Sequence, residues 1–399
     1  MNKLKNIVIL AGGDGDRFLP LADKNLVEFC GLSLLEHIIG DVQDKAEKIY
    51  VVVNADNREM IENKLGTKVT YLFQKKGMEG MGGALLSCEG TVSGETLVLN
   101  SSDYLNFDVL EKVVQAGTQK PFILVARKTD RYFPGGYVKV ENGKLMEIVE
   151  KPIPGSEPSD LVRLVVDYYS DLDLILAELK KAHTKNDDLY EQGFNALISQ
   201  GKADFVTYDD YLYCLKYSWH VLPLMNHFLF AMEHPSVDSS ATISSHAILT
   251  GPIHIGKRVK IGDYSKIVGP CYINDDAIIG DYAMIRESQI GKGSIIGGYS
   301  EVTRSYVGAA VSLHRNYVGD SVLSEGVTMG AGAVTANYRF DAKSVRTPIG
   351  GKIIDMQRDK CGLIAGKKVR IGVNAATYPG VKLSAGAIVL PGEVVVKDR

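Results

Sequence analysis

Three glycines near the start of the chain could bind the phosphate groups of a ligand. The apolar run 6–10 predicts a buried strand, and it is followed by closely spaced glycines, Gly12, Gly13 and Gly15. Backbone N–H groups in such a loop can approach phosphate oxygens because no side chain obstructs them. Arg17 and Lys24 add positive charge. This set suits substitution at phosphorus, where catalysis is mainly positioning and charge neutralisation. The alternative is a turn that only requires a positive φ.

One of the eight histidines is a candidate general base. His314 lies in the sequence LHRNYVGD, where a six-residue repeat is interrupted between Val307 and Val318. An imidazole titrates near neutral pH, so it can accept a proton from a reacting group at the pH of the cell. The alternative is that His314 is only a polar residue in an irregular turn. The other histidines lie on helical or turn segments, or at outward positions of the repeat (His246, His254).

The six-residue repeat predicts the element that positions His314. Aliphatic residues stand at every sixth position from Val237 to Ile285, and small or turn-forming residues tend to follow them. A period of six fits neither a helix nor a hairpin. It fits a parallel β-helix, because each unit forms one flat face with its aliphatic residue pointing inward. The repeat slips by one at Ile290, resumes at Ile296 and returns near the end of the chain. We therefore predict a β-solenoid over 231–399.

The segment 1–230 shows a different pattern, in which apolar strands alternate with amphipathic helices. The predicted helices include 32–42 and 57–66, and the predicted strands are 6–10, 49–54, 96–105 and 122–127. This alternation predicts a mostly parallel sheet covered on both faces. The glycine loop follows the first strand, where open α/β sheets bind ligands. A helix over 219–234 ends near Pro235, so we predict two domains, 1–230 and 231–399.

Composition is typical of a soluble, ordinary, intracellular protein. The chain has 399 residues, is 45% hydrophobic and carries a net charge of -3 without a long run of one sign. Neither a nucleic-acid nor an anionic-membrane surface is expected from this charge pattern. The apolar runs are too short to span a membrane. The cysteines are far apart and form no C-x-x-C pair, which argues against a zinc site and a disulfide framework: Cys30, Cys88, Cys214, Cys271 and Cys361. We expect a cytoplasmic protein.

The segment 1–230 resembles the sugar-1-phosphate nucleotidyltransferases. LAGGDGDRFLPL with Lys24 is similar to the family's loop L-A-G-G-x-G-T-R-L-x-P-L…P-K-P. The resemblance implies a Rossmann-like domain in which a sugar phosphate attacks the α-phosphate of UTP or dTTP and pyrophosphate leaves. It implies that Arg17, Lys24 and Mg²⁺ neutralise charge, with Asp103 in NSSDYL as the metal ligand. The implied nucleotide- and sugar-binding residues are Leu10, Ala11, Gly12, Gly13, Gly15, Gln74, Gly80, Gly136, Glu150 and Lys151.

This half of the chain departs from the family pattern at several positions. Asp16 replaces the loop threonine, Lys24 is not flanked by prolines, and the usual N-A-G segment is absent from VRLVVDYYSD. The second metal-binding carboxylate, expected in a W-x-D pattern, is replaced by Cys214, with Asp209 or Asp210 as alternatives. A single carboxylate is compatible with Mg²⁺, which binds largely through waters and substrate phosphates.

The C-terminal segment resembles the acetyltransferase half of bifunctional N-acetylglucosamine-1-phosphate uridylyltransferases. LHRNYVGD is similar to that family's H-L-T-Y-L-G-D, and MGAGAVTANYRFDAK is similar to its G-A-G-T-x-T-x-N-Y loop, in a version closer to archaeal-type enzymes. The resemblance implies that His314 is the general base when acetyl-CoA acetylates an amino-sugar 1-phosphate. The implied acceptor-binding residues are Arg286, Tyr317, Asn337, Tyr338 and Lys343, of which Arg286 and Lys343 would hold the sugar phosphate. The implied acetyl-CoA-binding residues are Ala331, Val373 and Ala385.

The same resemblance implies a left-handed parallel β-helix and a homotrimer, with acetyl-CoA bound between coils of neighbouring subunits. The family's phosphate-binding arginine falls near Gly269, and Lys266 is a possible substitute. Outward aromatic residues could form the subunit interface: Tyr264, Tyr272, Tyr282 and Tyr299.

Three functions are compatible with the sequence. The first is a bifunctional enzyme that acetylates an amino-sugar 1-phosphate and transfers a nucleotidyl group to the sugar 1-phosphate. The second is a nucleotidyltransferase with a structural β-helix. The third is an acetyltransferase with a silent, regulatory nucleotidyltransferase-like domain, which Cys214 and Asp16 favour. We predict the first. UTP and dTTP both remain open, as do glucosamine and galactosamine 1-phosphate.

Overall fold

The structure is a computed structural model that describes residues 3–13, 15–74, 77–78, 80–184 and 188–399. The chain divides into two compact units. The first unit consists of Met1–Asp14 and Leu34–Leu212, and the second of Gly15–Ser33 and Tyr213–Arg399. None of the described helices is long and apolar enough to cross a membrane. The domains 1–230 and 231–399 remain a prediction from the sequence.

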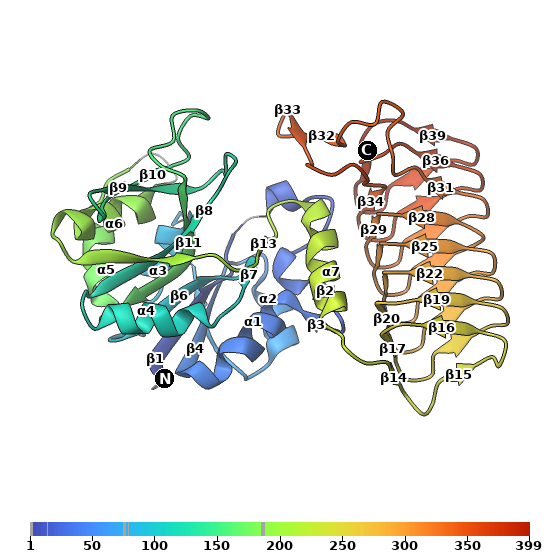
Figure 1. The fold of residues 1–399 in the computed structure, drawn as a ribbon, viewed down its shortest axis with the longest axis horizontal. Coiled ribbons are helices and arrows are strands. Elements are labelled where there is room, and N and C mark those ends of the chain that lie inside the picture. The colour runs from blue at the N-terminus through green and yellow to red at the C-terminus, as the bar shows by residue number, and fades with distance from the viewer. Residues whose placement is uncertain (1–2, 14, 75–76, 79, 185–187) are drawn as a thin grey trace. The chain divides into compact units, whose positions relative to one another are not determined.

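The first unit is built on a nine-stranded sheet (Figure 1). Its strand order is β10-β9-β11-β6-β1-β4-β5, and β8 pairs with both β11 and β12. The strands are β1 (Leu4–Leu10), β4 (Ala46–Val53), β5 (Thr70–Phe73), β6 (Thr96–Asn100), β8 (Phe122–Lys128), β9 (Gly136–Glu141), β10 (Lys144–Glu150), β11 (Leu161–Tyr169) and β12 (Ala203–Tyr208). The short β7 (Asp103–Leu105) follows β6. As predicted, β1, β4, β5 and β6 are parallel, whereas β11 runs antiparallel to β6, β8 and β9.

Helices cover this sheet because its strands are apolar on both faces. The helices are α1 (Leu34–Val42), α2 (Arg58–Leu65), α3 (Gly80–Leu86), α4 (Val109–Gly117), α5 (Asp173–Lys181) and α6 (Leu189–Ser199). Val8 and Leu10 of β1 join a core with residues of α3, α5 and α6. Ile7 and Ile9 are equally buried, and alternation along a strand directs them to the opposite face. This is the predicted sheet with two covered faces.

The second unit contains a β-helix of three eight-stranded parallel sheets. The first sheet consists of β14 (Ser236–Val237), β17 (Ile253–Ile255), β20 (Cys271–Ile273), β23 (Gln289–Ile290), β26 (Tyr306–Val307), β29 (Val322–Leu323), β34 (Ile364–Ala365) and β37 (Lys382–Leu383). The second sheet consists of β15 (Thr242–Ile243), β18 (Lys260–Ile261), β21 (Ile278–Ile279), β24 (Ile295–Ile296), β27 (Ser312–Leu313), β30 (Thr328–Met329), β35 (Arg370–Ile371) and β38 (Ile388–Val389). The third sheet consists of β16 (Ile248–Thr250), β19 (Lys266–Val268), β22 (Met284–Arg286), β25 (Glu301–Thr303), β28 (Tyr317–Gly319), β31 (Val334–Thr335), β36 (Ala376–Thr377) and β39 (Val394–Val395).

The six-residue repeat forms the core of this β-helix, as predicted. Ile255, Ile261 and Ile267 are each at most 3% exposed. Val237 and Leu249 belong to the same repeat but are 52% and 37% exposed, because they lie on the first coil, which has a neighbour on only one side. The slip at Ile290 reflects a shorter coil, since the register pair Ile273↔Ile290 is closer in sequence, by one position, than the pair Ile255↔Ile273 before it.

Segments outside the repeat pack onto the β-helix within the second unit. They contain β2 (Glu28–Phe29), β3 (Leu32–Ser33), α7 (Val221–Phe230), β32 (Arg346–Ile349) and β33 (Lys352–Asp355), and β13 spans Leu212–Cys214. The Gln289 amide donates to the Glu28 carbonyl and accepts from the Cys30 N–H, both at 2.8 Å. The Phe29 ring stacks on Phe228 with centroids 5.4 Å apart. The hairpin β32–β33 projects from the β-helix (Figure 1).

Candidate active sites

Three of the residues predicted for acetyl transfer lie at one corner of the β-helix. We call the turns between its second and third sheets the site corner. His314 lies at this corner between β27 and β28, and Ala331 and Val373 lie at it on the next two coils. The Asn374 N–H donates to the Ala331 carbonyl at 2.9 Å, which links these two coils. Ala385 instead lies between β37 and β38, at the corner between the first and second sheets. The structure therefore brings His314, Ala331 and Val373 together but leaves Ala385 apart from them.

His314 lines a hollow of about 450 Å³ on the surface of the site corner. The hollow is formed by Gly297, Gly298, Tyr299, His314, Arg315 and Ala331. The turn that carries the histidine is fixed from below by Asn316, which is 3% exposed. Asn316 accepts from the His314 N–H at 2.5 Å and donates to the carbonyls of Gly330 and Ala333 at 2.8 and 3.0 Å. The imidazole thus stands at the edge of an open hollow on an anchored backbone. Asn316 was not among the residues selected from the sequence, although it lies within the LHRNYVGD segment.

A polar network lies beside Tyr317, on the third sheet of the same coil. The Asn337 amide donates to the Tyr317 hydroxyl at 3.2 Å and to Asp320 at 2.6 Å. The Asp320 side chain is 3% exposed, and Arg304 donates two hydrogen bonds to it, both at 2.8 Å. Two predicted acceptor-binding residues, Tyr317 and Asn337, are therefore in contact. Asp320 and Arg304 hold Asn337 in place, and neither role was predicted from the sequence. Asp320 is the last residue of the LHRNYVGD segment, which was the only sequence feature that could have indicated its role.

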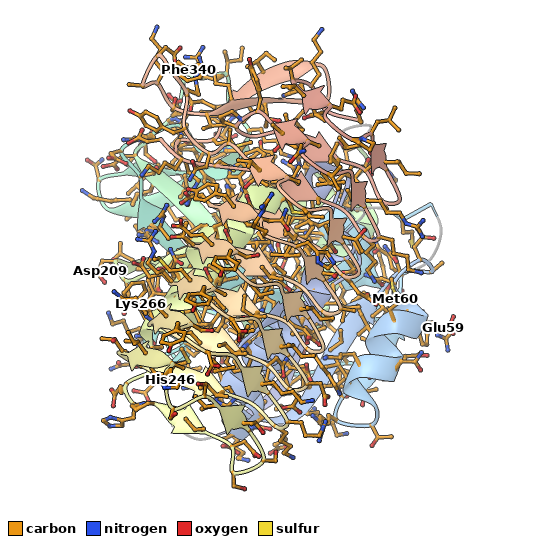
Figure 2. All side chains as sticks on the ribbon, turned by 90° about the vertical axis from the view of Figure 1, so that its right-hand side faces the viewer. Glu59, Met60, Asp209, His246, Lys266 and Phe340 are labelled. Carbon is orange, nitrogen blue, oxygen red and sulfur yellow. The ribbon has the colours of Figure 1, made fainter. Side chains whose placement is uncertain are left out.

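The predicted phosphate-binding cations lie on coils below Tyr317. Arg286 is on β22, two coils below, and donates to Glu301 at 2.5 Å, while Glu301 pairs in register with Tyr317. The possible substitute, Lys266, is exposed (Figure 2) and lies three coils below Tyr317 in the same column, about 14 Å away at the usual strand spacing. Lys266 is therefore one coil further from Tyr317 than Arg286 is.

Two further predicted residues belong to the long connection between β31 and β34. Tyr338 forms an isolated antiparallel bridge with Lys360 and is 48% exposed. Lys343 is exposed, and its backbone N–H donates to Asp341 at 3.3 Å. Tyr338 follows Asn337 directly, so this connection leaves the β-helix beside the Tyr317 network.

The outward aromatic residues form a stacked ladder that leads to the hollow. The rings of His246, Tyr264, Tyr282 and Tyr299 lie at successive turns of the site corner, with centroids 5.0, 5.1 and 5.0 Å apart. His246 is labelled on the lower coils in Figure 2. Tyr272 differs from the other predicted tyrosines, because it stacks on His254 at 4.5 Å and burial raises its pKa to about 12. A Cβ at Gly31 would lie 2.5 Å from its hydroxyl, so the segment around Gly31 covers this tyrosine.

In the first unit, the glycine loop begins at the carboxyl edge of the parallel strands. Leu10 and Ala11 are buried, and the Ala11 N–H donates to the Val52 carbonyl at 2.8 Å. Asn54 donates to the Gly12 carbonyl at 2.9 Å, and Asn57 donates to the Ala11 carbonyl at 2.7 Å. Asn54 directly follows β4 and Asn57 directly precedes α2, and both fix the loop backbone, a role that was not predicted from the sequence.

The structure brings Gly12, Gln74 and Gly80 together. A Cβ at Gly12 would lie 2.2 Å from Gln74 Oε1, so a side chain at this position would displace the end of Gln74. The Gln74 amide donates to the carbonyls of Met78 and Gly80 at 2.6 and 3.1 Å. Gly13 is exposed. Gly15, Arg17 and Lys24 belong to the second unit, where Gly15 has φ 73 with no atom near its Cβ position and Arg17 is exposed. At Gly15 it is the turn itself that requires glycine.

Asp103 has the environment of a carboxylate prepared for a cation. Its Oδ2 accepts from Asn100 at 2.9 Å, whereas its Oδ1 is buried and has no hydrogen-bond partner. An unpartnered buried carboxylate oxygen is costly unless a ligand completes it, so Asp103 fits a Mg²⁺ ligand. Asp209 and Asp210 stay possible second carboxylates from the sequence. Asp209 is exposed (Figure 2), and Asp210 accepts from Asn106 at 2.9 Å. No group of three or more acidic, histidine or cysteine side chains suited to a metal occurs within the described ranges.

The predicted sugar-binding segment forms the hairpin of β9 and β10. Gly136 pairs in register with Glu150, and a Cβ at Gly136 would lie 3.3 Å from Glu150 Oε2. Lys151 forms an ion pair with Glu150 at 2.9 Å. The structure therefore brings Gly136, Glu150 and Lys151 together, and the same Cβ position at Gly136 would lie 3.9 Å from the Cβ of Arg163 on β11.

A buried charged cluster lies beneath this hairpin. Arg163 donates to Asp167 through Nε at 3.3 Å and also through Nη2, and both side chains are at most 3% exposed. Glu191 of α6 lies 3.6 Å from Arg163, and the guanidinium stands 4.1 Å from the Phe194 ring centroid. Burial raises the pKa of Glu191 to about 7, and Glu150 adds to this shift whereas Arg163 opposes it. Arg163 and Asp167 belong to VRLVVDYYSD, the segment that lacks the family's N-A-G.

We expect Glu191 to make the stability of the first unit depend on pH. Between the ordinary carboxyl value of 4.5 and about 7, the folded state holds a proton on Glu191 that the unfolded state has released. The free energy of unfolding therefore falls as pH rises through this window, by roughly 3 kcal/mol. Glu191→Gln removes this loss. In thermal melts, the melting temperature of Glu191→Gln relative to that of the wild type should be about 5 to 10 °C higher at pH 8 than at pH 5.

Glu178→Gln is the matched control for this prediction. Hydrogen bonds from Lys181 and Gln200 lower the pKa of Glu178, so its contribution to stability is lost as pH falls. That loss lies below pH 4.5, where the folded and unfolded states bind different numbers of protons, so the difference in melting temperature between Glu178→Gln and the wild type should be the same at pH 5 and at pH 8. A difference between Glu191→Gln and wild type that is the same at both pH values would contradict the assignment.

Comparison with known proteins agrees with both halves of this description. The nucleotidyl transferase family matches residues 6–212, and the bacterial transferase hexapeptide family (six repeats) matches residues 252–287. The chain therefore belongs to the nucleotidyl transferase family, with a hexapeptide-repeat β-helix attached. The predicted family resemblance and fold class are confirmed, and the three parallel sheets are consistent with a left-handed β-helix.

Two relatives cover nearly the whole chain. The bifunctional sugar-1-phosphate nucleotidylyltransferase/acetyltransferase of Sulfurisphaera tokodaii is 29% identical over 98% of this chain and 97% of its own length. The bifunctional protein GlmU of Methanococcus maripaludis is 30% identical over 98% of this chain and 94% of its own length. A solved structure of UDP-glucose pyrophosphorylase complexed with UDP-glucose has a TM-score of 0.50 and 18% identity, covering 57% of this chain and 99% of its own. That likeness supports the fold.

Proposed function

We propose that this chain is a bifunctional enzyme of sugar-nucleotide synthesis. It acetylates an amino-sugar 1-phosphate with acetyl-CoA and transfers a nucleotidyl group from UTP or dTTP to the sugar 1-phosphate. The observation that carries the proposal is a single coil of the β-helix, which places His314 at an open hollow and Tyr317 beside the Asn337–Asp320 network. One relative named for both activities and another named as bifunctional each align with 98% of the chain, which supports assigning both activities to it.

For acetyl transfer, His314 acts as the general base. Its imidazole accepts a proton from the amine as the amine nitrogen attacks the thioester carbon. The carbon–sulfur bond then breaks, which gives an N-acetyl sugar phosphate and free CoA. Tyr317 and Asn337 bind the acceptor, with Arg286, Tyr338 and Lys343 as further acceptor-binding residues. The edge formed by Ala331 and Val373 binds acetyl-CoA. Ala385 lies at a different corner of the β-helix from His314. We therefore propose that Ala385 binds acetyl-CoA only at a site where a different subunit supplies His314.

For nucleotidyl transfer, a phosphate oxygen of the sugar 1-phosphate attacks the α-phosphorus, and the bond to pyrophosphate breaks. The backbone of Leu10 to Gly13 and the Gln74–Gly80 contact bind the nucleotide, while Gly136, Glu150 and Lys151 bind the sugar. Gly15, Arg17 and Lys24 act on the phosphates. Asp103 would hold Mg²⁺, which supplies charge neutralisation when bound. The unpartnered Oδ1 of Asp103 supports this assignment.

Two steady-state assays on one wild-type preparation test the proposal. The first follows thiol release from acetyl-CoA with glucosamine or galactosamine 1-phosphate. The second follows pyrophosphate release from UTP or dTTP with the N-acetylated sugar 1-phosphate and Mg²⁺. Turnover in both assays supports the bifunctional enzyme. Thiol release alone would indicate an inactive nucleotidyltransferase-like domain, as the departures at Asp16 and Cys214 favour. Pyrophosphate release alone would indicate that the β-helix is only a structural element.

We propose that the protein works as a homotrimer in the cytoplasm. The exposed ladder of Tyr264, Tyr282 and Tyr299 supports an interface along the site corner, because these rings are 49–67% exposed in the single chain. We predict that light scattering after size exclusion gives three times the chain mass of 43.5 kDa. A mass equal to one chain at assay concentrations would contradict the trimer. The cysteines are all free in the structure, which supports a reducing compartment.

A further inference from the structure

Arg315 is the arginine of the hollow, and no acidic side chain in the described parts of the chain forms an ion pair with it. It follows His314 directly and is exposed. The two other arginines near Tyr317 are already engaged, Arg286 with Glu301 at 2.5 Å and Arg304 with Asp320 at 2.8 Å. A carboxylate balances part of the charge of each of these two guanidiniums, although their five N–H donors leave room for an anionic ligand as well. The charge of Arg315 is not balanced in this way by any described acidic side chain.

The backbone around Arg315 directs its side chain along the site corner. Arg315 has φ 49, in the left-handed region that non-glycine residues rarely adopt. Its carbonyl accepts from the Gly332 N–H at 3.2 Å, which fixes the turn. A Cβ at Gly332 would lie 3.9 Å from Arg315 Nη2, so the guanidinium lies toward the next coil. Ala331 on that coil lines the same hollow. The cation therefore faces the space beside the imidazole.

The ladder of stacked rings ends one turn of the site corner before Arg315. Tyr299 stacks on Tyr282 with the ring planes 7° apart, and Tyr299 is the last ring of the ladder. At the next turn of the site corner the position is occupied by Arg315, and at the turn after that by Gly332. The change from aromatic to cationic to glycine coincides with the hollow. It indicates that the column of residues is specialised for a ligand at this level.

We infer that Arg315 binds the phosphate monoester of the acceptor during acetyl transfer, an inference that rests on the proposed function. In a 2-amino sugar 1-phosphate, the amine on C2 and the phosphate on C1 belong to neighbouring carbons. A cation next to the base that deprotonates the amine is therefore within reach of that phosphate. Acetyl-CoA also carries phosphates, but the pantetheine chain separates them from the thioester. A guanidinium offers paired N–H donors that match phosphate oxygens.

The test compares acceptors with and without phosphate in Arg315→Gln. The KM for glucosamine 1-phosphate should rise about 10- to 100-fold, the effect of removing a hydrogen bond to a charged group. The rate with unphosphorylated glucosamine and the KM for acetyl-CoA should match the wild type. Arg315→Lys should restore part of the affinity, because it keeps the charge. Arg370→Gln is the matched control, since Arg370 is an exposed arginine on β35 of the second sheet.

Calorimetric titration of glucosamine 1-phosphate gives a readout that does not need turnover. The wild type should bind it more tightly than Arg315→Gln does, and both should bind glucosamine equally. Equal affinity of the two proteins for the sugar phosphate would overturn the inference. A raised KM for acetyl-CoA with an unchanged KM for the sugar phosphate would also overturn it, because the phosphate read by Arg315 would then belong to the donor. If the wild type releases no thiol with any acceptor, the proposed function fails, and the titration still decides the role of Arg315.

Discussion

Replacing His314 by alanine is expected to lower thiol release from acetyl-CoA by about 10²- to 10⁴-fold, the usual contribution of a general base. Pyrophosphate release should remain unchanged. The imidazole lies at a hollow and its backbone is anchored by the hydrogen bond from the His314 N–H to Asn316. That hydrogen bond involves no side-chain atom of His314, so the alanine variant keeps the turn. The loss should appear mainly in kcat, because the amine must lose its proton in the reacting complex.

The matched control for this prediction is His246→Ala. His246 lies at the same corner on the first coil, and its ring stacks on Tyr264 and lies 3.4 Å from Asp263. Its removal changes a surface histidine of the same β-helix without changing the hollow. Thiol release by His246→Ala should equal that of the wild type. If His314→Ala also retained wild-type thiol release while remaining folded in thermal melts, the β-helix would not use this imidazole as a base.

The β-helix could be predicted from the sequence because each position of the repeat has one structural meaning. Ile255, Ile261 and Ile267 point inward since every six-residue unit forms one face. The corner of a given residue is harder to predict, because it depends on the length of each coil. The coil from Val307 to its register partner Leu323 is shorter by two positions than the coil from Ile255 to Ile273. For this reason the sequence alone did not show that Ala385 lies at a different corner from Ala331.

The contacts around Tyr317 could not be derived from spacing. Asn337 belongs to the coil after Tyr317, and its amide reaches back to Asp320 at 2.6 Å. Arg304 reaches Asp320 from the coil before. Neighbours on adjacent coils are separated in sequence by a whole turn of the β-helix, and side chains that meet there have no local signal. Tyr317 and Asn337 were identified through resemblance, whereas Asp320 and Arg304 required the coordinates.

In the first unit, the parallel strands were predicted but the antiparallel ones were not. Strands 6–10 and 122–127 carry continuous apolar runs, which is the pattern of strands buried on both faces. β11 instead contains Arg163 and Asp167, two charged residues that are buried because they pair with each other. A buried ion pair of this kind depends on the partner's position in space. The sequence therefore showed that the N-A-G segment is missing from β11. It did not show that a buried pair of Arg163 and Asp167 stands in its place.

Replacing Asp103 by asparagine is expected to lower pyrophosphate release by roughly 10²- to 10³-fold, since the charge stabilisation supplied through a bound metal is worth several kcal/mol. Thiol release should not change. The substitution preserves the size of the side chain, and an amide oxygen can still accept the hydrogen bond that Asn100 donates to Oδ2 at 2.9 Å. What it removes is the negative charge at the buried Oδ1, which has no protein partner.

Calorimetry separates this loss of charge from a general loss of folding. Mg²⁺ should tighten binding of UTP or dTTP to the wild type but not to Asp103→Asn. Asp108→Asn is the control, because Asp108 is an acidic residue five positions further on that lies 4.0 Å from Lys45 with its side chain 85% exposed. It should keep both the activity and the Mg²⁺ dependence. If Asp103→Asn also kept them, the metal would be held by the substrate phosphates and other groups. The unpartnered oxygen of Asp103 would then destabilise the folded state without contributing to catalysis.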